Sequence, residues 1–252
     1  MTEPTFNPDT LSADVNAPPK ASHPPETTKA SKGPKKVKVW DISVRFFHWA
    51  LVASIGFLWY SGETGGTAMD WHVYVGYFVL GLIIYRVIWG FIGSRYARFG
   101  QFVTGPFVTL KYGAQFLIGR EKEHLSHNPL GSWMVLILLT VIFLQAATGL
   151  FASDDIFIEG PLYSLVPSDI AGMLTKIHHF NFNVILACIA LHIAAVLVHL
   201  VFKREHLARS MVTGYKTSKS SEAVSIKEPF IRMSIVAIIA IAAVYGIVQL
   251  GG

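Results

Sequence analysis

The chain has 252 residues, of which 52% are hydrophobic and only 15% are charged, and its formal net charge at pH 7 is +5. The apolar residues gather in a few long blocks, which excludes an ordinary soluble globular domain and predicts a membrane protein. Because the basic residues concentrate in the segments between those blocks, the positive charge indicates membrane topology and argues against nucleic-acid binding.

Residues 1–38 form a segment rich in Pro, Ser, Thr, Lys and Asp, with no apolar periodicity before Val37. Such a composition cannot bury enough apolar surface to order itself, so we expect a disordered tail. The segment lacks the short apolar region and the cleavage site of a signal peptide, so the first membrane helix would serve as an uncleaved signal.

Five apolar blocks follow, each about as long as the ~20 residues that a helix needs to cross a bilayer. They cover residues 44–61, 71–93, 131–152, 177–202 and 230–249. The fold class expected is an all-α membrane protein, in which four transmembrane helices form a bundle and one additional C-terminal transmembrane helix follows. The predicted domains are a tail over 1–38, a transmembrane domain over 39–216, and a linker with the fifth helix over 217–252.

The connecting segments alternate in charge. The tail, the segment between the second and third helices, and the segment after the fourth helix are basic. Loops 62–70 and 153–176 contain one lysine, Lys176, and six acidic residues. The positive-inside rule therefore predicts a cytoplasmic N-terminus and a C-terminus on the opposite side of the membrane.

Six histidines lie within the predicted helices, and ionisable groups there suggest function because a bilayer makes them costly. Four of the six have a geometric relation to one another. His178 and His192 are 14 residues apart, which corresponds to roughly 21 Å along a helix and to one face within about 40°. His48 lies near the inner start of the first helix, and His72 lies at the outer start of the second. The spacing therefore predicts two cross-helix pairs, His48 with His192 and His72 with His178.

Two imidazoles that face each other across a bundle suit the two axial positions of a haem iron, which favours electron transfer over oxygen binding. Structural zinc instead needs four N or S ligands at one point, whereas these histidines divide two and two. Four unrelated core histidines are one alternative. Another is a proton or metal transporter with a histidine-lined path, although such proteins have broken helices or repeats and residues 177–202 contain no Pro or Gly.

Two arginines are candidate partners for a cofactor carboxylate. Arg86 follows His72 by 14 residues, so it is expected on the His72 face at the depth of the inner histidine pair. A haem propionate would supply the carboxylate for a charge-assisted hydrogen bond, and snorkelling toward the headgroups is the alternative. Arg45, one turn before His48, is a second candidate.

Several fragments are familiar when taken in order. Together they resemble the bacterial cytochrome b561 family and the related b-type cytochrome subunits of nickel-iron hydrogenases, over roughly residues 38–216. The fragments are "VWDISVRFFHW", "WHVYVGYFVLGLIIYRVIWGFIGSRYARFGQFVTGP", "SHNPLGSW", "KIHHFNFNVILACIALH" and "MVTGYK". The long tail and the fifth helix lie outside the minimal family pattern.

The resemblance implies a four-helix, dihaem, multi-pass cytochrome of the bacterial cytoplasmic (inner) membrane. It implies that His48 and His192 hold the iron of an inner haem b and that His72 and His178 hold the iron of an outer haem b. The C-terminus would then be periplasmic, and lipid would surround the bundle.

The resemblance also implies electron transfer between a quinone pool and a redox partner, such as a c-type cytochrome or a dehydrogenase or hydrogenase subunit. An enzyme that oxidises superoxide or another small donor and reduces quinone is an alternative hypothesis. His127 and Asn128 lie where similar b-type subunits bind quinone, and an imidazole with an amide suits a quinone carbonyl. The favoured interpretation of this stretch is a helix start with Asn128 as N-cap and Pro129 as the first helical residue.

Overall fold

The computed structural model describes residues 33, 35–120, 124–154, 156, 158–218 and 224–251. Residues 1–32, which make up most of the predicted disordered tail, lie outside the described residues. Five of the described helices are long and apolar enough to cross a membrane. The predicted all-α membrane fold is therefore confirmed.

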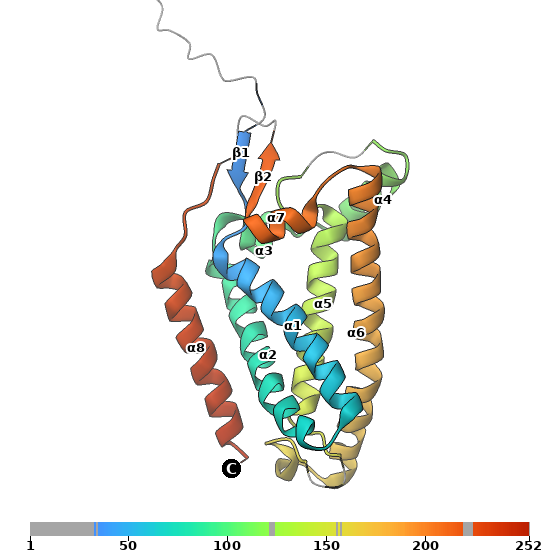
Figure 1. Cartoon of the computed structure of the whole chain (residues 1–252), viewed down its shortest axis with the longest axis vertical. Helices are drawn as coiled ribbons and strands as arrows, with labels where there is room; N and C mark the ends of the chain where they lie inside the picture. Colours follow the sequence, from blue (N-terminus) through green and yellow to red (C-terminus); the bar gives the residue numbers. More distant parts are fainter. Residues whose placement is uncertain are drawn as a thin grey trace, which may run out of the picture. The chain divides into compact units, whose positions relative to one another are not determined.

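The membrane-spanning helices are joined by short elements (Figure 1). The long helices are α1 (Ile42–Thr64), α2 (Thr67–Ile92), α5 (Pro129–Gly149), α6 (Ser168–Phe202) and α8 (Phe230–Gln249). The short elements at one end are β1 (Lys35–Lys38), η2 (Arg95–Ala97), α3 (Phe99–Phe102), α4 (Pro106–Leu117), α7 (Leu207–Thr213) and β2 (Tyr215–Ser218). A 3-10 turn, η3 (Tyr163–Leu165), lies in the connection from α5 to α6 at the other end.

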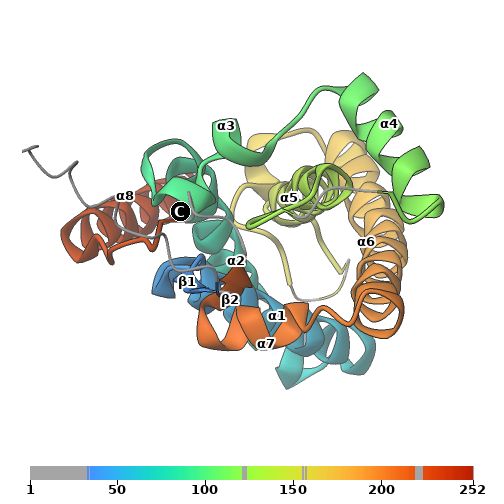
Figure 2. The same ribbon diagram turned by 90° about the horizontal axis from the view of Figure 1, so that it is seen from above.

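Helices α1, α2, α5 and α6 form two hairpins that meet in a bundle (Figure 2). Gly65 and Gly66 make the tight turn between α1 and α2, and both have positive φ angles, which glycine adopts without steric cost. The hairpins meet where α2 packs against α5. Ile83, Leu139 and Ile185 are buried in the core between them, so this apolar contact fixes the distance between the two hairpins.

Helix α8 packs along α2, outside the four-helix bundle. Its contact face is apolar and tightly packed, because Val236 and Ala240 are buried and the side chain of Val244 lies beside Gly81 of α2. The rest of α8 exposes large apolar residues such as Ile231 and Ile241, which is the pattern of a helix that faces lipid.

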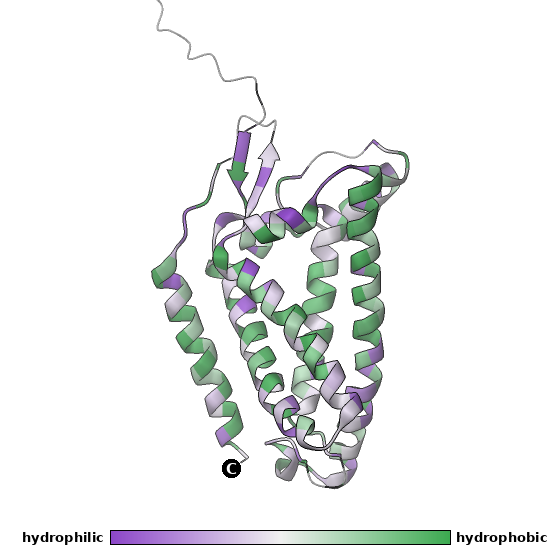
Figure 3. Cartoon of the chain, viewed as in Figure 1, coloured by the Kyte–Doolittle hydropathy of each residue, from purple (hydrophilic) through white to green (hydrophobic). Residues whose placement is uncertain are grey.

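Helix α6 begins at Ser168, nine residues before the predicted start at 177. With 35 residues it is roughly 52 Å long at 1.5 Å per residue, well beyond the ~30 Å apolar thickness of a bilayer. The hydropathy pattern detects only its apolar part, because the first turns hold polar residues such as Asp169. Figure 3 shows hydrophilic residues gathered toward the two ends of the bundle.

A short two-stranded sheet lies at the end of the bundle that carries α3, α4 and α7. Strand β1 pairs antiparallel with β2, with Lys35 opposite Ser218 and Lys38 opposite Tyr215. The expectation of disorder through residue 38 was therefore wrong for residues 35–38. Their pairing partner lies about 180 residues away in the sequence, and Val37 is buried, so local composition could not reveal this strand.

Candidate functional site

The structure brings His72 of α2 and His178 of α6 together across the bundle. Their ring centres are 6.4 Å apart and the ring planes meet at 66°. Metal–imidazole bonds are about 2 Å long, and each ring nitrogen lies about 1 Å from its ring centre. One metal ion between two imidazoles therefore separates the ring centres by about 6 Å, so the observed spacing suits an iron atom held by both rings.

The hydrogen bonds of Nδ1 define the tautomer of the His72 ring. The Nδ1 atom lies 3.0 Å from Oγ of Ser61, a fully buried residue of α1. Ser61 donates its own proton to the carbonyl of Leu58 at 3.2 Å, so the Ser61 oxygen accepts from Nδ1–H of His72. The proton on Nδ1 leaves the Nε2 lone pair free to bind a metal.

The ring of His178 is held in the same tautomer by α5. Its Nδ1 lies 3.0 Å from the carbonyl oxygen of Gln145 and 3.2 Å from Oγ1 of Thr148. A carbonyl can only accept, so Nδ1 carries the proton and Nε2 has a free lone pair. One turn away, Asn181 donates to Oε1 of Gln145 and to the carbonyl of Val141, both at 2.8 Å, which fixes α6 against α5.

Two glycines leave space for these rings. A Cβ atom at Gly149 would lie 3.0 Å from Cε1 of His178, closer than such contacts normally are, and a Cβ at Gly62 would lie 3.6 Å from Cε1 of His72. Each glycine directly follows a residue that contacts the imidazole: Gly149 follows Thr148, and Gly62 follows Ser61. The positions of both rings therefore depend on small residues in the neighbouring helix.

His48 of α1 and His192 of α6 lie toward the other end of the bundle. The Nδ1 atom of His48 is buried and has no hydrogen-bond partner among the described residues, and the Trp49 ring packs edge-on against the imidazole. A buried imidazole nitrogen without a partner is costly in an apolar region.

Arg86 is the buried cation of this end of the bundle. It is only 3% exposed, and its Nη1 atom has no hydrogen-bond partner among the described residues. Its guanidinium carbon lies 5.0 Å from the centre of the Phe99 ring, which supplies a cation–π contact but no anion. An unpaired donor on a buried guanidinium leaves one position for an acceptor such as a carboxylate.

Arg45 is partly occupied by contacts within the protein. Its Nη1 donates a 2.7 Å hydrogen bond to the carbonyl of Val212, and its side chain lies against Gly214. Its buried Nε has no hydrogen-bond partner among the described residues. Arg45 therefore joins α1 to the turn after α7, and it has less free capacity for an anion than Arg86.

Asn128 caps α5, as the favoured interpretation predicted. Its Oδ1 accepts a 2.7 Å hydrogen bond from the amide of Gly131, so its Nδ2 group is the donor in the 3.1 Å contact with Nε2 of His199. His199 in turn donates from Nδ1 to the carbonyl of Ala195 at 2.9 Å. The side-chain oxygen and nitrogen of Asn128 therefore each have a protein partner.

His127 lies between aromatic rings just before α5. Its ring centre is 4.9 Å from that of Trp40 and 4.6 Å from that of Phe102. Its Nδ1 is buried without a hydrogen-bond partner among the described residues. Burial, with a smaller contribution from the charges of Arg86 and Lys216, lowers the pKa of His127 from 6.5 to about 3.

Sequence reasoning missed the residues that orient the imidazoles: Ser61, Gln145, Thr148 and Asn181. The signal was present, because a glutamine or asparagine inside an apolar helix is costly and suggests a specific partner.

His124 and His206 lie in the short segments beside α4 and α7, and His23 lies outside the described residues. No three His, Cys, Asp or Glu residues among those described lie together as a metal-binding group.

The chain is similar to known membrane cytochromes. The profile of the prokaryotic cytochrome b561 family matches residues 39–214, a range that includes all four histidines of the two pairs. A probable Ni/Fe-hydrogenase B-type cytochrome subunit from Rhizobium leguminosarum bv. viciae is 24% identical over 223 residues, covering 75% of this chain and 92% of that protein. No solved structure matches the chain.

Proposed function

Because the chain belongs to the prokaryotic cytochrome b561 family and is therefore a b-type cytochrome that transfers electrons in a membrane, we propose the following specific role for it. It binds two haem b groups and carries electrons across the bacterial cytoplasmic membrane. The electrons pass between a quinone pool and a redox partner protein. The cytochrome domain covers residues 39–216, and the tail and α8 are additions to it.

The observation that carries the proposal is the facing pair His72 and His178. The spacing of their ring centres suits one iron atom, and the Nδ1 proton of each ring is directed to an acceptor on a neighbouring helix. Such hydrogen bonds orient an imidazole and make its free nitrogen a better ligand. These two residues would hold the outer haem b.

His48 and His192 would hold the inner haem b. The support for this pair is the buried Nδ1 of His48, which has no hydrogen-bond partner among the described residues. Arg86 would bind a propionate there, because no described residue supplies an acceptor to its buried Nη1. Arg45 is the weaker propionate partner, since its Nη1 already donates to Val212.

Haem iron with two imidazole ligands supplies one-electron redox chemistry. The protein's own contribution is to orient the imidazoles of His72 and His178 through hydrogen bonds to Nδ1 and to exclude water from the core between the hairpins. Buried Ile83 and Ile185 belong to that core. A low-dielectric surrounding changes the relative stability of the two charge states of a bound iron.

The quinone contact is proposed at the end of the bundle that holds His127. A polar atom available there is the buried Nδ1 of His127, which has no hydrogen-bond partner among the described residues. Asn128 has its side-chain groups occupied by Gly131 and His199, so it would contribute by positioning the start of α5. With its pKa lowered to about 3, His127 is neutral at physiological pH and would serve as a hydrogen-bond partner of the quinone.

The redox partner is proposed to be a c-type cytochrome or a subunit of a dehydrogenase or hydrogenase. The named relative is described as a hydrogenase cytochrome subunit, which supports a partner of this class. The basic segments beside α4 and α7 support a cytoplasmic N-terminus. The last helix would then leave the C-terminus in the periplasm.

The test is the reduced-minus-oxidised spectrum of the purified chain, together with its haem b content. We expect two low-spin haem b groups per chain, and their oxidation when a quinone is added to the reduced protein. One haem per chain would refute the dihaem proposal. Reduction by superoxide at a rate that supports turnover without a partner subunit would replace the partner proposal by a small-donor oxidoreductase.

A further inference from the structure

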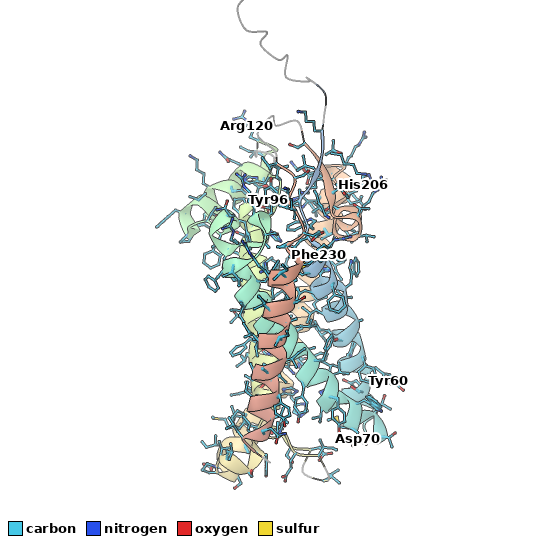
Figure 4. The ribbon with its side chains drawn as sticks, turned by 90° about the vertical axis from the view of Figure 1, so that its left-hand side faces the viewer. Tyr60, Asp70, Tyr96, Arg120, His206 and Phe230 are labelled. Carbon is cyan, nitrogen blue, oxygen red and sulfur yellow. The ribbon has the colours of Figure 1, made fainter. Side chains whose placement is uncertain are left out.

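A basic pocket lies where the end of α2 meets the approach to α8. Its cavity has a volume of about 260 Å³. The basic residues that line it are Arg95, Arg98, Lys227 and Arg232, and the rest of its wall consists of small or apolar residues of the two segments. Figure 4 shows this region near the labelled Tyr96 and Phe230.

Two acidic side chains of the described part of the chain, Glu228 and Asp41, stand beside the segments of the pocket and already have partners. Glu228, beside Lys227, forms an ion pair of 2.5 Å with Lys38 and accepts a 3.2 Å hydrogen bond from the amide of Ile42. Asp41 is fully buried, where it accepts from Ser94 and Trp89. Among the described residues, the lining of the pocket includes four cations and no acidic side chain, and an anion would relieve the mutual repulsion of these cations.

Hydrogen bonds within the protein hold the wall of the pocket in place. The hydroxyl of Tyr96 donates to the carbonyl of Val224 at 3.0 Å. The amide of Lys38 donates to Oγ of Ser225 at 3.1 Å, and the amide of Ile226 donates back to the carbonyl of Lys38 at 3.2 Å. The segment before α8 is thus bound to both η2 and β1, so the pocket is a preformed feature.

Apolar side chains lie on the membrane side of the pocket. Phe91 and Ile92 end α2, Phe230 and Ile231 begin α8, and all four are exposed. A basic pocket beside an exposed apolar surface at the end of two membrane helices matches the two parts of a phospholipid. A soluble phosphate would use only the basic part.

We propose that this pocket binds the phosphate headgroup of an anionic phospholipid, whose acyl chains lie along α2 and α8. Arginines suit this role because the guanidinium binds phosphate oxygens in a bidentate manner. The site depends on α8, which lies outside the residues matched by the family. The bound lipid would stabilise the contact of α8 with the cytochrome domain, a role separate from electron transfer.

The test is lipid binding by the full chain in detergent, measured by native mass spectrometry after addition of phosphatidylglycerol or phosphatidylcholine. The pocket variant is Arg98→Gln/Arg232→Gln. The control is Lys111→Gln/Arg209→Gln, which removes two exposed cations of α4 and α7 at the same end of the bundle. Each cation contributes about fivefold to the affinity for an anionic membrane.

We expect the wild type and the control to retain phosphatidylglycerol, and the pocket variant to bind it at least tenfold more weakly. Equal retention by the pocket variant and the control, or equal binding of phosphatidylcholine, would overturn the proposal. Displacement of phosphatidylglycerol by millimolar inorganic phosphate would also overturn it and identify a phosphate site.

A second measurement on the wild-type protein applies if the pocket variant does not fold. Arginine modification by phenylglyoxal is followed by peptide mass spectrometry in nanodiscs of phosphatidylglycerol and of phosphatidylcholine. We expect phosphatidylglycerol to protect Arg98 and Arg232 more than Arg209, which lies outside the pocket. Equal modification in the two lipids would refute the site.

Discussion

The indole Nε1 of Trp89 donates a 3.1 Å hydrogen bond to the carboxylate of Asp41, and both residues are fully buried. The other carboxylate oxygen accepts from the amide of Val44 at 2.8 Å and caps the first turn of α1. One carboxylate therefore fixes the start of α1 to the last turns of α2. This contact sets the position of the helix that carries His48.

Replacing Asp41 with Asn is expected to destabilise the protein by about 2–4 kcal/mol. The amide keeps the shape but has one acceptor oxygen, so either the cap or the Trp89 hydrogen bond meets an NH₂ group. The measurement is thermal unfolding of Asp41→Asn, Trp89→Phe and the double variant. The Asn substitution should cost less stability once the indole donor is absent. A loss in the double variant equal to the sum of the two single losses would therefore contradict the coupling between Asp41 and Trp89.

The Asp41 contact also shows where sequence reasoning ends. In the sequence Asp41 is one acidic residue beside a basic tail, and its partner Trp89 is 48 residues away. Nothing local distinguishes such a residue from a solvated one. The β1–β2 pair was missed for the same reason, since Lys35 and Ser218 are distant in sequence.

The helices and the spacing of the histidines could be predicted because they follow from local regularities. The apolar length needed to cross a bilayer and the 3.6-residue helical repeat act within one element. They predict which histidines share a depth, but not which residues orient the rings. Ser61 and Gln145 belong to other helices than the histidines they bind, so only the packing of the hairpins reveals them.

Replacing His178 with Ala is expected to remove one of the two proposed haem groups and to leave the other. The matched control is His179→Ala, which removes the adjacent imidazole of the same helix. Haem b per chain, measured as the pyridine haemochrome, should fall from about two to about one in the first variant only. Equal haem loss in both variants would contradict the assignment of His178 as the ligand.

Replacing Gly149 with Ala tests the space beside the same imidazole. The new Cβ would lie 3.0 Å from Cε1 of His178, so the ring must shift by a few tenths of an ångström. We expect weaker haem retention or a changed midpoint potential for one of the two haem groups. Gly172→Ala is the control, because that glycine of α6 has no atom within 4 Å of the added Cβ, and its spectrum should be that of the wild type.

The proposed orientation can be tested by labelling single cysteines in a Cys188→Ser background, since Cys188 is the one cysteine of the chain. Leu250→Cys follows α8, and Lys111→Cys lies in α4; both positions are exposed. A membrane-impermeant maleimide should label position 250 in spheroplasts and position 111 only in inverted vesicles. The reverse pattern would refute the cytoplasmic N-terminus.

The pH dependence of stability is expected to depend on His127. Its pKa is about 3 in the folded protein and about 6.5 in an unfolded chain. Between these values the unfolded chain binds a proton that the folded protein does not, so stability falls as the pH decreases from 6.5 toward 3. At pH 5 the loss reaches about 2 kcal/mol for this one group.

His127→Phe removes the titrating group and keeps a ring between Trp40 and Phe102. The difference in thermal midpoint between pH 7.5 and pH 5 should therefore be smaller in this variant than in the wild type. An exposed histidine at the start of α7 provides the control as His206→Gln, which should keep the wild-type difference. Removing the titrating group should reduce the change of stability with pH. If His127→Phe has the same pH dependence of stability as the wild type, protonation of His127 does not limit stability in acid.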